Sequence, residues 1–311
     1  MAEKLKILAC PSNHGGCAYY RILLPMNKLQ ELYGDEVEIR FDDNPLGWEK
    51  PEKDGQPSKE TPANFEFSAI KWADIVFTQN IHNFGGRYTI ETMQRAHQFG
   101  KFTHFDTDDL LTDLYPGHRL FEIYTKQQLA EVTKYVYNNV DLVSVTQKKF
   151  AARIAPFCRA ALCVIKNAID YSMPCWNGKK VPPPNKKLTR LGWVGGIHHD
   201  VDVKHFATIP FLVNQKVGKE KVHWGFYGKP TQPPEERDWQ WDVWEGYERI
   251  LSAGFRGHRN YTVYPAMPPN AYGEMYKHID INIAVLDNNN FNDSKSEIKV
   301  MEGARFGVPL I

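Results

Sequence analysis

Residues 5–41, LKILACPSNHGGCAYYRILLPMNKLQELYGDEVEIRF, contain the pattern that decides the fold. A mostly apolar run, Leu5–Cys10, precedes a turn rich in Pro, Ser, Asn and Gly, which predicts a buried strand. Apolar residues from Ile22 to Tyr33 then recur at helical spacing, and a second strand is predicted over Val37–Phe41. A strand, a helix and a strand in this order indicate two parallel strands joined by a crossover helix.

The same alternation continues to the end of the chain. Further strands are predicted over residues 74–78, 101–105, 142–146, 161–165, 191–194, 222–227, 261–264, 281–286 and 308–311. Helices are predicted over residues 88–99, 120–138, 147–155, 201–213, 269–278 and 296–306. This alternation predicts an α/β fold with mainly parallel sheets that are covered by helices on both faces. Residues 42–63 are polar and rich in Pro, Lys and Asp, so they are predicted to form a loop or insertion.

Residues 170–187 interrupt the pattern with several prolines and lysines, which predicts a stiff, solvated linker. We therefore expect two Rossmann-like domains, residues 1–170 and 188–311, joined by a linker over residues 171–187. Two such domains in tandem are expected to face each other across a cleft at the carboxyl ends of their sheets, where ligands bind. Because the chain ends inside a predicted strand, we expect the second domain to be incomplete.

Composition excludes several classes of protein. The 311 residues carry a formal net charge of only +1, whereas a protein that binds DNA by charge alone has a clear basic excess. The five cysteines form no Cys-x-x-Cys pair, so neither a zinc site nor a disulfide framework is predicted. Reduced thiols fit a cytoplasmic protein. No stretch approaches the roughly 20 apolar residues that a membrane span requires.

The strongest local signal is the segment 292–304, NDSKSEIKVMEGA, which follows a predicted strand and opens a predicted helix. The unpaired N–H groups and the dipole of a helix N-terminus favour an anion. Lys295, Lys299 and Glu302 are expected on one helix face. There the cations suit a diphosphate, and the carboxylate suits the hydroxyls of a ribose. A capped surface helix with an internal ion pair explains the same residues about equally well.

Glycine-rich turns follow the first strand of each predicted domain. Gly15 and Gly16 in one turn, and Gly195 and Gly196 in the other, would let the backbone approach a ligand closely. His198 and His199 could donate hydrogen bonds to phosphate. Ordinary strand-to-helix turns and a solvent-exposed histidine are the alternatives.

A cluster of carboxylates, Asp106-Thr-Asp-Asp109, ends another predicted strand. Clustered carboxylates can bind a metal or act as acid and base, but they can equally cap a turn. We favour capping over metal binding. Farther along, Trp239, Trp241, Trp244 and Tyr247 form an aromatic cluster. It is expected to pack an insertion against the second domain, and stacking on a sugar or base is the alternative.

Together these segments resemble the GT-B glycosyltransferases, which consist of two Rossmann-like domains. They are most similar to the family 4 type and to a branch common in phage and bacterial genomes. The resemblance runs through most of the chain and rests on the order of residues 15–25, 105–110, 141–146, 164–170, 192–196, 291–302 and 307–311.

The resemblance implies transfer of a sugar, with retention, from a nucleotide diphosphate sugar to an acceptor hydroxyl, without a metal or other cofactor. Glu302 matches the second glutamate of the family's acidic pair, which holds the ribose. The first acid is replaced by Ser294, and the family's Arg and Lys phosphate clamp is altered. Lys229 or Lys295 is then expected to supply positive charge. Asp106 lies near the position of a histidine found in many relatives and is expected to orient the acceptor hydroxyl.

The predicted catalytic residues are therefore Asp106, Lys229 and Lys295. The predicted donor-binding residues are Gly15, Gly16, Gly195, Gly196, His198, Asn292, Ser294, Lys295, Ser296, Lys299 and Glu302. Residues 1–170 are expected on the acceptor side and residues 188–311 on the donor side. The acceptor is open between a modified DNA base and a glycan, lipid or protein. A nucleotide-sugar epimerase and a catalytically weak sugar-nucleotide-binding protein are the alternative functions.

Overall fold

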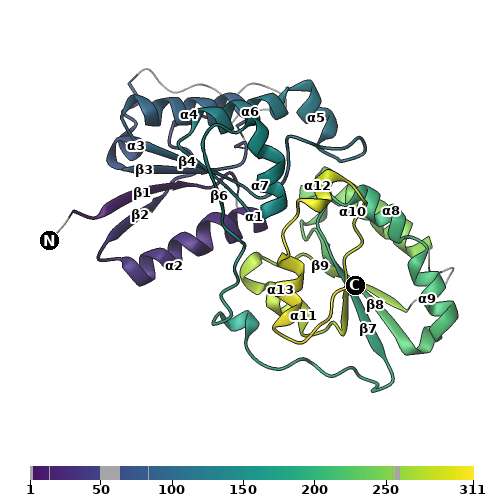
Figure 1. Ribbon diagram of the computed structural model, residues 1–311. Coiled ribbons are helices and arrows are strands. Elements are labelled where there is room, and N and C mark those ends of the chain that lie inside the picture. Colours follow the sequence, from purple (N-terminus) through teal and green to yellow (C-terminus); the bar gives the residue numbers. More distant parts are fainter. Residues whose placement is uncertain (1–2, 14, 50–63, 83, 254, 256–259) are drawn as a thin grey trace. The chain divides into compact units, whose positions relative to one another are not determined.

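The computed structural model of the protein describes residues 3–13, 15–49, 64–82, 84–253, 255 and 260–311. These residues form two compact units (Figure 1). The first comprises Met1–Leu114, Glu122–Ala168 and Asp293–Ser296, and the second comprises Tyr115–Phe121, Ile169–Asn292 and Glu297–Ile311. Each unit is built on a parallel sheet, which confirms the predicted α/β fold class with two Rossmann-like domains. From residue 50 on, the loop predicted over residues 42–63 lies outside the described residues.

The described part of the first unit contains a six-stranded parallel sheet in the order β2-β1-β3-β4-β5-β6. The strands are β1 (Leu5–Cys10), β2 (Val37–Phe41), β3 (Ile75–Gln79), β4 (Phe102–Thr107), β5 (Leu142–Val145) and β6 (Ala161–Val164). The helices are α1 (Gly16–Ala18), α2 (Leu24–Tyr33), α3 (Ser68–Trp72), α4 (Gly86–Gln98), α5 (Phe121–Lys126), α6 (Leu129–Asn139) and α7 (Lys148–Ile154). In Figure 1, α2 lies below this sheet and α4 and α6 lie above it.

Strand β1 shows why its sequence is almost continuously apolar. Leu8 packs with Tyr88 of α4 in one buried cluster, and Ile7 packs with Ile22 in another. Successive side chains of a strand point to opposite faces, and helices cover both faces of this sheet. From Ile7 to Cys10, the side chains on both faces of β1 are therefore buried.

The described part of the second unit contains a four-stranded parallel sheet in the order β10-β7-β8-β9. The strands are β7 (Thr189–Val194), β8 (Val222–Lys229), β9 (Tyr261–Pro265) and β10 (Ile281–Ile283). The helices are α8 (Asp200–Phe206), α9 (Ile209–Val217), α10 (Trp239–Ala253), α11 (Tyr272–Tyr276), α12 (Asn290–Asp293) and α13 (Ile298–Ala304).

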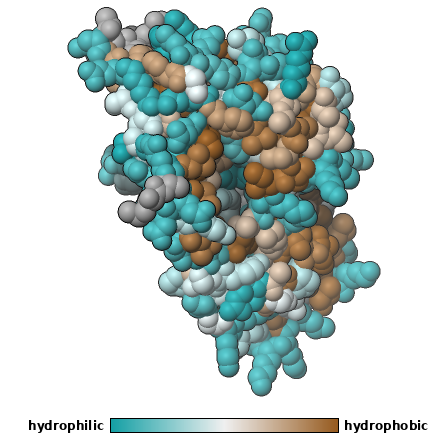
Figure 2. Space-filling view, turned by 60° about the vertical axis from the view of Figure 1, so that its left-hand side comes forward, coloured by the Kyte–Doolittle hydropathy of each residue, from teal (hydrophilic) through white to brown (hydrophobic). Residues whose placement is uncertain are grey.

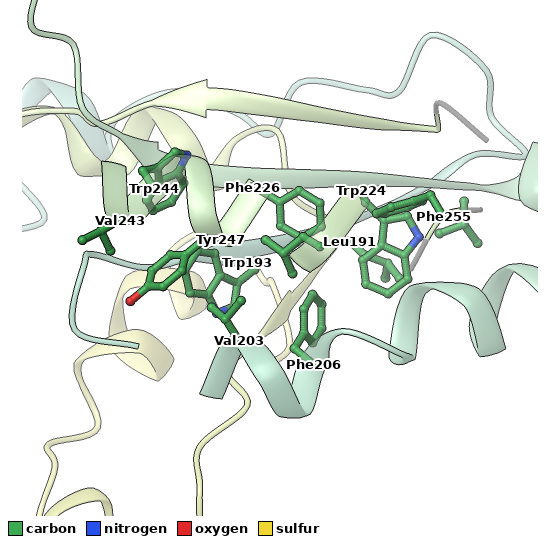
Figure 3. Packing of buried hydrophobic residues seen from close by; sticks show 12 residues of the cluster. Leu191, Trp193, Val203, Phe206, Trp224, Phe226, Val243, Trp244, Tyr247 and Phe255 are labelled. Atoms are coloured by element: carbon green, nitrogen blue, oxygen red, sulfur yellow. The ribbon is translucent and has the colours of Figure 1, made fainter. Parts of the chain in front are cut away.

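Aromatic side chains dominate the core of the second unit. Figure 3 shows Trp193 and Trp224 of the sheet in one cluster with Trp244 and Tyr247 of α10. Helix α10 is an element that the sequence analysis did not predict. Two of its aromatic residues belong to the core itself, whereas Trp239 at its start is half exposed. The aromatic cluster is therefore mainly part of the hydrophobic core of this unit.

Three other expectations differ from the structure. The helix predicted over residues 120–138 is two helices, α5 and α6, separated at Gln128, whose φ of 52° is left-handed. The helix predicted over residues 201–213 is divided into α8 and α9, and Pro210 lies in the first turn of α9, where a missing N–H is tolerated. The strand predicted over residues 308–311 is present as a single parallel bridge from Leu310 to Asn282.

The segment expected to be a solvated linker is partly buried. Cys175 and Trp176 lie in a short 3₁₀ helix (Pro174–Trp176), and both pack in a cluster with Tyr276 and Val308. The large apolar surface of Trp176 favours this burial, which the flanking prolines and lysines concealed in the sequence.

Hydrophobic side chains also reach the surface. Figure 2 shows them as brown areas among teal, hydrophilic residues. The most exposed ones on helices include Leu32 of α2 and Leu212 of α9. Within the part of the chain that is described, no helix has both the length and the apolar character that crossing a membrane requires.

Candidate functional site

In the sheet of the second unit, the direction in which successive strands are added reverses at β7. Strands β8 and β9 follow β7 on one side, and β10 lies on its other side. In open α/β sheets, ligands bind outside the carboxyl ends of the strands at such a reversal. The loops concerned are residues 195–199 after β7 and residues 284–289 after β10. The first loop contains the predicted donor residues Gly195, Gly196 and His198.

One buried carboxylate connects these two loops. Asp202 of α8 is 2% exposed, and its Oδ1 accepts a 2.8 Å hydrogen bond from the backbone N–H of Asp287. Its Oδ2 lies 2.8 Å from Nδ1 of His199. A carboxylate at one ring nitrogen fixes the orientation of an imidazole and the tautomer it adopts. Sequence reasoning identified His199 only as a possible hydrogen-bond donor to phosphate. It missed Asp202, for which the only local signal was the spacing of three positions from His199.

Two glycines in this region are required by close packing. Gly195 is buried, and a Cβ atom on it would lie 2.3 Å from the ring of Trp193. Gly228 has a φ of 131°, and a Cβ atom there would lie 2.0 Å from the carbonyl oxygen of Gly195. Gly196 is exposed and has open space around its Cβ position. The backbone at Gly196 is therefore accessible to a ligand.

Glu302 of α13 is a buried carboxylate, 1% exposed. The hydroxyl of Tyr276 donates a 2.7 Å hydrogen bond to its Oε2, and Nζ of Lys299 lies 3.4 Å from the same oxygen. Burying an ionised carboxylate costs free energy unless it is paired and hydrogen-bonded, and here it is both. Tyr276 was missed by sequence reasoning.

The predicted helix face is not formed as expected. Helix α13 begins at Ile298, so Lys295 precedes it, while Lys299 and Glu302 lie on it three positions apart. Of the other predicted residues in this segment, Asn292 and Ser294 are buried. The amide of Asn292 donates a 3.0 Å hydrogen bond to the carbonyl of Asp287.

The four residues Asp293–Ser296 belong to the first unit, although their neighbours in sequence belong to the second. The amide of Gln147 donates hydrogen bonds to the carbonyls of Asp293 and Lys295, at 2.9 and 3.0 Å. The amide of Asn167 donates a 2.7 Å hydrogen bond to Oγ of Ser296. The segment predicted to bind a diphosphate is thus held by first-unit side chains that sequence reasoning did not identify.

Lys229 and His198 both contact other side chains of the second unit. Nζ of Lys229 lies 2.9 Å from a carboxylate oxygen of Glu248 and 5.0 Å from the ring centre of Trp241, both on α10. The ring of His198 stacks on that of His118, with the centroids 6.0 Å apart. A phosphate that used Lys229 would have to replace its contact with Glu248.

In the first unit, the glycine-rich turn after β1 is shaped by Asn13. Its Oδ1 accepts a 2.8 Å hydrogen bond from the backbone N–H of Gly15, which is exposed, and Gly16 begins α1. A π-helical turn, Tyr19–Leu23, then joins α1 to α2. Such turns are rare and frequently occur at functional sites.

Asp106 lies in a buried ion pair. Its side chain is 1% exposed; Nε and Nη2 of Arg21 donate to its two oxygens at 2.9 and 2.5 Å, and the hydroxyl of Ser144 donates at 2.5 Å. Arg21 also donates to the carbonyl of Ile165 and to Oδ1 of Asn167. A carboxylate engaged in this way orients Arg21 rather than a ligand, so the expected contact with an acceptor hydroxyl is not supported by this placement.

The same surroundings also determine the protonation state of His104. Burial, and then the positive charge of Arg21, lower the pKa of His104 to about 4, so the ring is neutral near pH 7.

Among the described residues, no group of three or more His, Cys, Asp or Glu side chains is placed to hold a metal ion.

Comparison with known proteins identifies similar folds. No protein-family model matches the chain, and no curated protein sequence is significantly similar to it. A sucrose-phosphate synthase from Thermosynechococcus elongatus aligns with a TM-score of 0.62 and 12% identity, covering 99% of this chain and 80% of that one.

Two further solved structures show the same arrangement of elements. A protein assigned as a UDP-N-acetylglucosamine 2-epimerase from Listeria monocytogenes has a TM-score of 0.54 and 12% identity, covering 99% of this chain and 78% of that one. The trehalose-6-phosphate protein from E. coli bound with UDP-2-fluoro glucose has a TM-score of 0.52 and 10% identity, covering 91% and 78%. At such identities the likeness establishes the fold, which is that of the GT-B proteins.

Proposed function

We propose that the protein is a glycosyltransferase that moves a sugar, with retention, from a nucleotide diphosphate sugar to an acceptor hydroxyl. The observation that carries this proposal is the buried carboxylate of Glu302, held by Tyr276 and Lys299. A carboxylate is rarely buried in a protein, and Glu302 stands where the resemblance places the residue that holds the ribose. A similar fold is known with UDP-2-fluoro glucose bound, which supports a nucleotide sugar as the donor.

In this proposal, Glu302 accepts hydrogen bonds from the ribose hydroxyls, with Lys299 beside it. We assign diphosphate binding to the segment Asn292–Ser296, to the backbone of Gly15 and Gly16, and to the loop of Gly195, Gly196 and His198. As the bond from the sugar to the phosphate oxygen breaks, negative charge develops on the diphosphate. Positive side chains and N–H donors stabilise that charge. Lys295 and Lys229 are the cations we assign to this task, the latter after leaving Glu248.

The transfer itself needs no protein nucleophile. The acceptor oxygen forms its bond to the sugar on the face from which the diphosphate departs. A phosphate oxygen takes the proton of the acceptor hydroxyl. We assign to Asp106 a positioning role, because it holds Arg21, which contacts Asn167, which in turn holds Ser296.

Several finer statements belong to the same proposal. Residues 1–170 take the acceptor, residues 171–187 link the domains, and residues 188–311 bind the donor. The transfer proceeds without a metal, and the protein is of the family 4 type from a phage or bacterial genome. All five cysteines are free thiols, which supports the cytoplasm, of a host cell for a phage protein, as its location. A modified DNA base and a glycan are the acceptors we propose to test first.

Calorimetric titration with UDP, GDP and ADP tests the donor site. We expect one nucleotide to bind with micromolar affinity, and Glu302→Gln to weaken it about 10- to 100-fold, since a hydrogen bond to a charged group contributes about 1.5–3 kcal/mol. The control is Glu274→Gln on α11, a half-exposed carboxylate paired with Lys277, which should bind as the wild type does. Absence of binding to all three nucleotides, or wild-type affinity in Glu302→Gln, would contradict the proposal.

A nucleotide-sugar epimerase is the second candidate, favoured by the similar fold of the Listeria protein. Product analysis without any acceptor separates the two, because an epimerase changes the configuration of the donor sugar and a transferase does not.

A catalytically weak sugar-nucleotide-binding protein is the third candidate, because Ser294 stands where the resemblance leads one to expect an acid. Donor binding without transfer or hydrolysis would favour it.

A further inference from the structure

A small pocket lies in the first unit at the carboxyl end of β3, where the strand order of the sheet reverses between β1 and β3. Gln79 and Asn80 contribute to it from the end of β3, Cys10 from the end of β1, and Tyr88 and Thr92 from α4. Its volume is about 10 Å³, which is room for about one water molecule. It lies within one unit and involves none of the residues assigned to the donor.

The pocket contains a buried amide without partners. Gln79 is 1% exposed, and neither its Nε2 nor its Oε1 has a hydrogen-bond partner among the described residues. Oδ1 of the adjacent Asn80 is also buried without a partner there, and Asn80 has a left-handed φ of 48°. Buried polar groups in native proteins are nearly always hydrogen-bonded, so such a group indicates a missing water or ligand. A strained backbone next to it is typical of a ligand-binding position.

The neighbouring hydroxyls do not supply the missing partner. The hydroxyl of Thr92 donates a 3.0 Å hydrogen bond to the carbonyl of Tyr88. The hydroxyl of Tyr88 donates a 3.0 Å hydrogen bond to Oδ1 of Asn44. The hydroxyls of Thr92 and Tyr88 are therefore already engaged, and the amide of Gln79 offers two N–H donors and a carbonyl acceptor to whatever enters.

The charge around the pocket disfavours an anion. Neither lysine nor arginine is among its lining residues. Burial raises the pKa of the Cys10 thiol well above its ordinary value, and the carboxylates of Asp42 and Asp43 raise it further. The same negative charges that disfavour a thiolate would disfavour a phosphate or carboxylate of a ligand. A hydroxyl group suits the site, because it is uncharged and both donates and accepts hydrogen bonds.

We propose that this pocket is a subsite for one uncharged hydroxyl group of a sugar acceptor, held by the amide of Gln79 together with Oδ1 of Asn80. The inference rests on the proposed function, in which the first domain takes the acceptor, and it deepens that function by naming a neutral rather than a phosphorylated acceptor. One hydroxyl replaces one water, so the pocket holds an end of the acceptor and selects against an anionic group at that end.

Ligand-observed NMR of the full chain with D-glucose and with glucose 6-phosphate tests the subsite. We expect glucose to bind at millimolar concentration and glucose 6-phosphate at least about tenfold more weakly. Gln79→Leu, which has a similar volume and removes the amide, should weaken glucose binding at least about tenfold, because a lost hydrogen bond contributes about this factor. Gln94→Leu, an exposed position on α4, is the control and should bind as the wild type does.

Three results would overturn the subsite: glucose 6-phosphate binding as well as glucose, wild-type affinity in Gln79→Leu, or no glucose binding at all. Circular dichroism confirms that Gln79→Leu folds. Titration of the same samples with UDP, GDP and ADP separates the two proposals. Nucleotide binding without glucose binding rejects the subsite alone, and glucose binding without nucleotide binding rejects the proposed donor site alone.

Discussion

Replacing Asp106 by Asn distinguishes a positioning role from a direct contact with the acceptor. The side chains of Arg21 and Asp106 are 3% and 1% exposed and share two hydrogen bonds. Asparagine keeps the shape but removes the charge, which leaves a buried guanidinium uncompensated. Removing one partner of a buried ion pair costs about 3–5 kcal/mol. For a domain of this size, about 1 kcal/mol shifts Tm by about 2–4 °C, so we expect Tm to fall by about 6–20 °C.

The assay is thermal unfolding followed by circular dichroism, with a surface ion pair as the control. Arg40 and Glu38 lie 3.1 Å apart with side chains about half exposed. Glu38→Gln should cost at most about 1 kcal/mol, because solvent screens such pairs. The double variant Arg21→Met with Asp106→Leu should recover part of the loss, since an apolar pair often replaces a buried ion pair at little cost. Recovery is incomplete because Arg21 also holds the carbonyl of Ile165.

The reasoning is refuted by one combination of results. If Asp106→Asn unfolds at the same temperature as Glu38→Gln while transfer to the acceptor collapses at saturating donor, the carboxylate contacts the acceptor. Its role would then be catalytic, as the sequence suggested, and the buried pair with Arg21 would not describe the working protein.

Two further predictions concern pH and backbone packing. The pKa of His104 lies near 4 in the folded protein and near 6.5 when unfolded, so the unfolded state binds this proton first and stability is lost as pH falls from about 6.5 toward 4. In His104→Gln this part of the pH dependence of Tm should disappear, and an unchanged slope would exclude His104 as its source. Gly228→Ala should lower Tm strongly, because its Cβ would meet the carbonyl of Gly195, whereas Gly196→Ala should be tolerated. Equal losses of Tm in the two variants would contradict the close approach of the loops.

The sequence predicted the strands well and several helices poorly. The bounds of β1 and β2 agree with the prediction. β1 is a mostly apolar run that ends at turn residues, and β2 alternates apolar and polar residues, as a strand at the edge of the sheet does. Helix α10 was missed because its tryptophans were interpreted as an insertion that packs against the second domain. The division between α5 and α6 was missed because Gln128 gives no sign of its left-handed φ. The local sequence pattern therefore identified strands that end at clear turn residues, and it failed where one backbone angle, the φ of Gln128, divides a helix.

In the candidate site, too, features of a short stretch of sequence could be predicted, whereas contacts between residues far apart in the chain could not. Gly195 and Gly196 could be proposed because a glycine-rich turn after a strand is visible in the sequence, and the structure confirms that this turn follows β7. The partner of Asp106 was not found, because Arg21 lies 85 positions away, and the contact of Gln147 with Lys295 spans 148 positions. No spacing rule connects residues at such distances, so only the fold identifies which polar groups satisfy one another.

In the segment Asp293–Ser296, contacts with residues far away in the chain change the interpretation of how the segment would attract a diphosphate. From sequence, its attraction for a diphosphate was assigned to a helix N-terminus, but α13 has seven residues and begins at Ile298. The structure supplies positive charge in another way. Lys149 and Arg153 of α7 both contact Asp293, at 2.6 and 2.8 Å, and their hydrogen bonds hold the pKa of that carboxyl below its ordinary value. Two cations against one carboxylate leave an excess positive charge next to Asp293, so the proposed attraction of this segment for a diphosphate rests on side-chain charge rather than on a helix dipole.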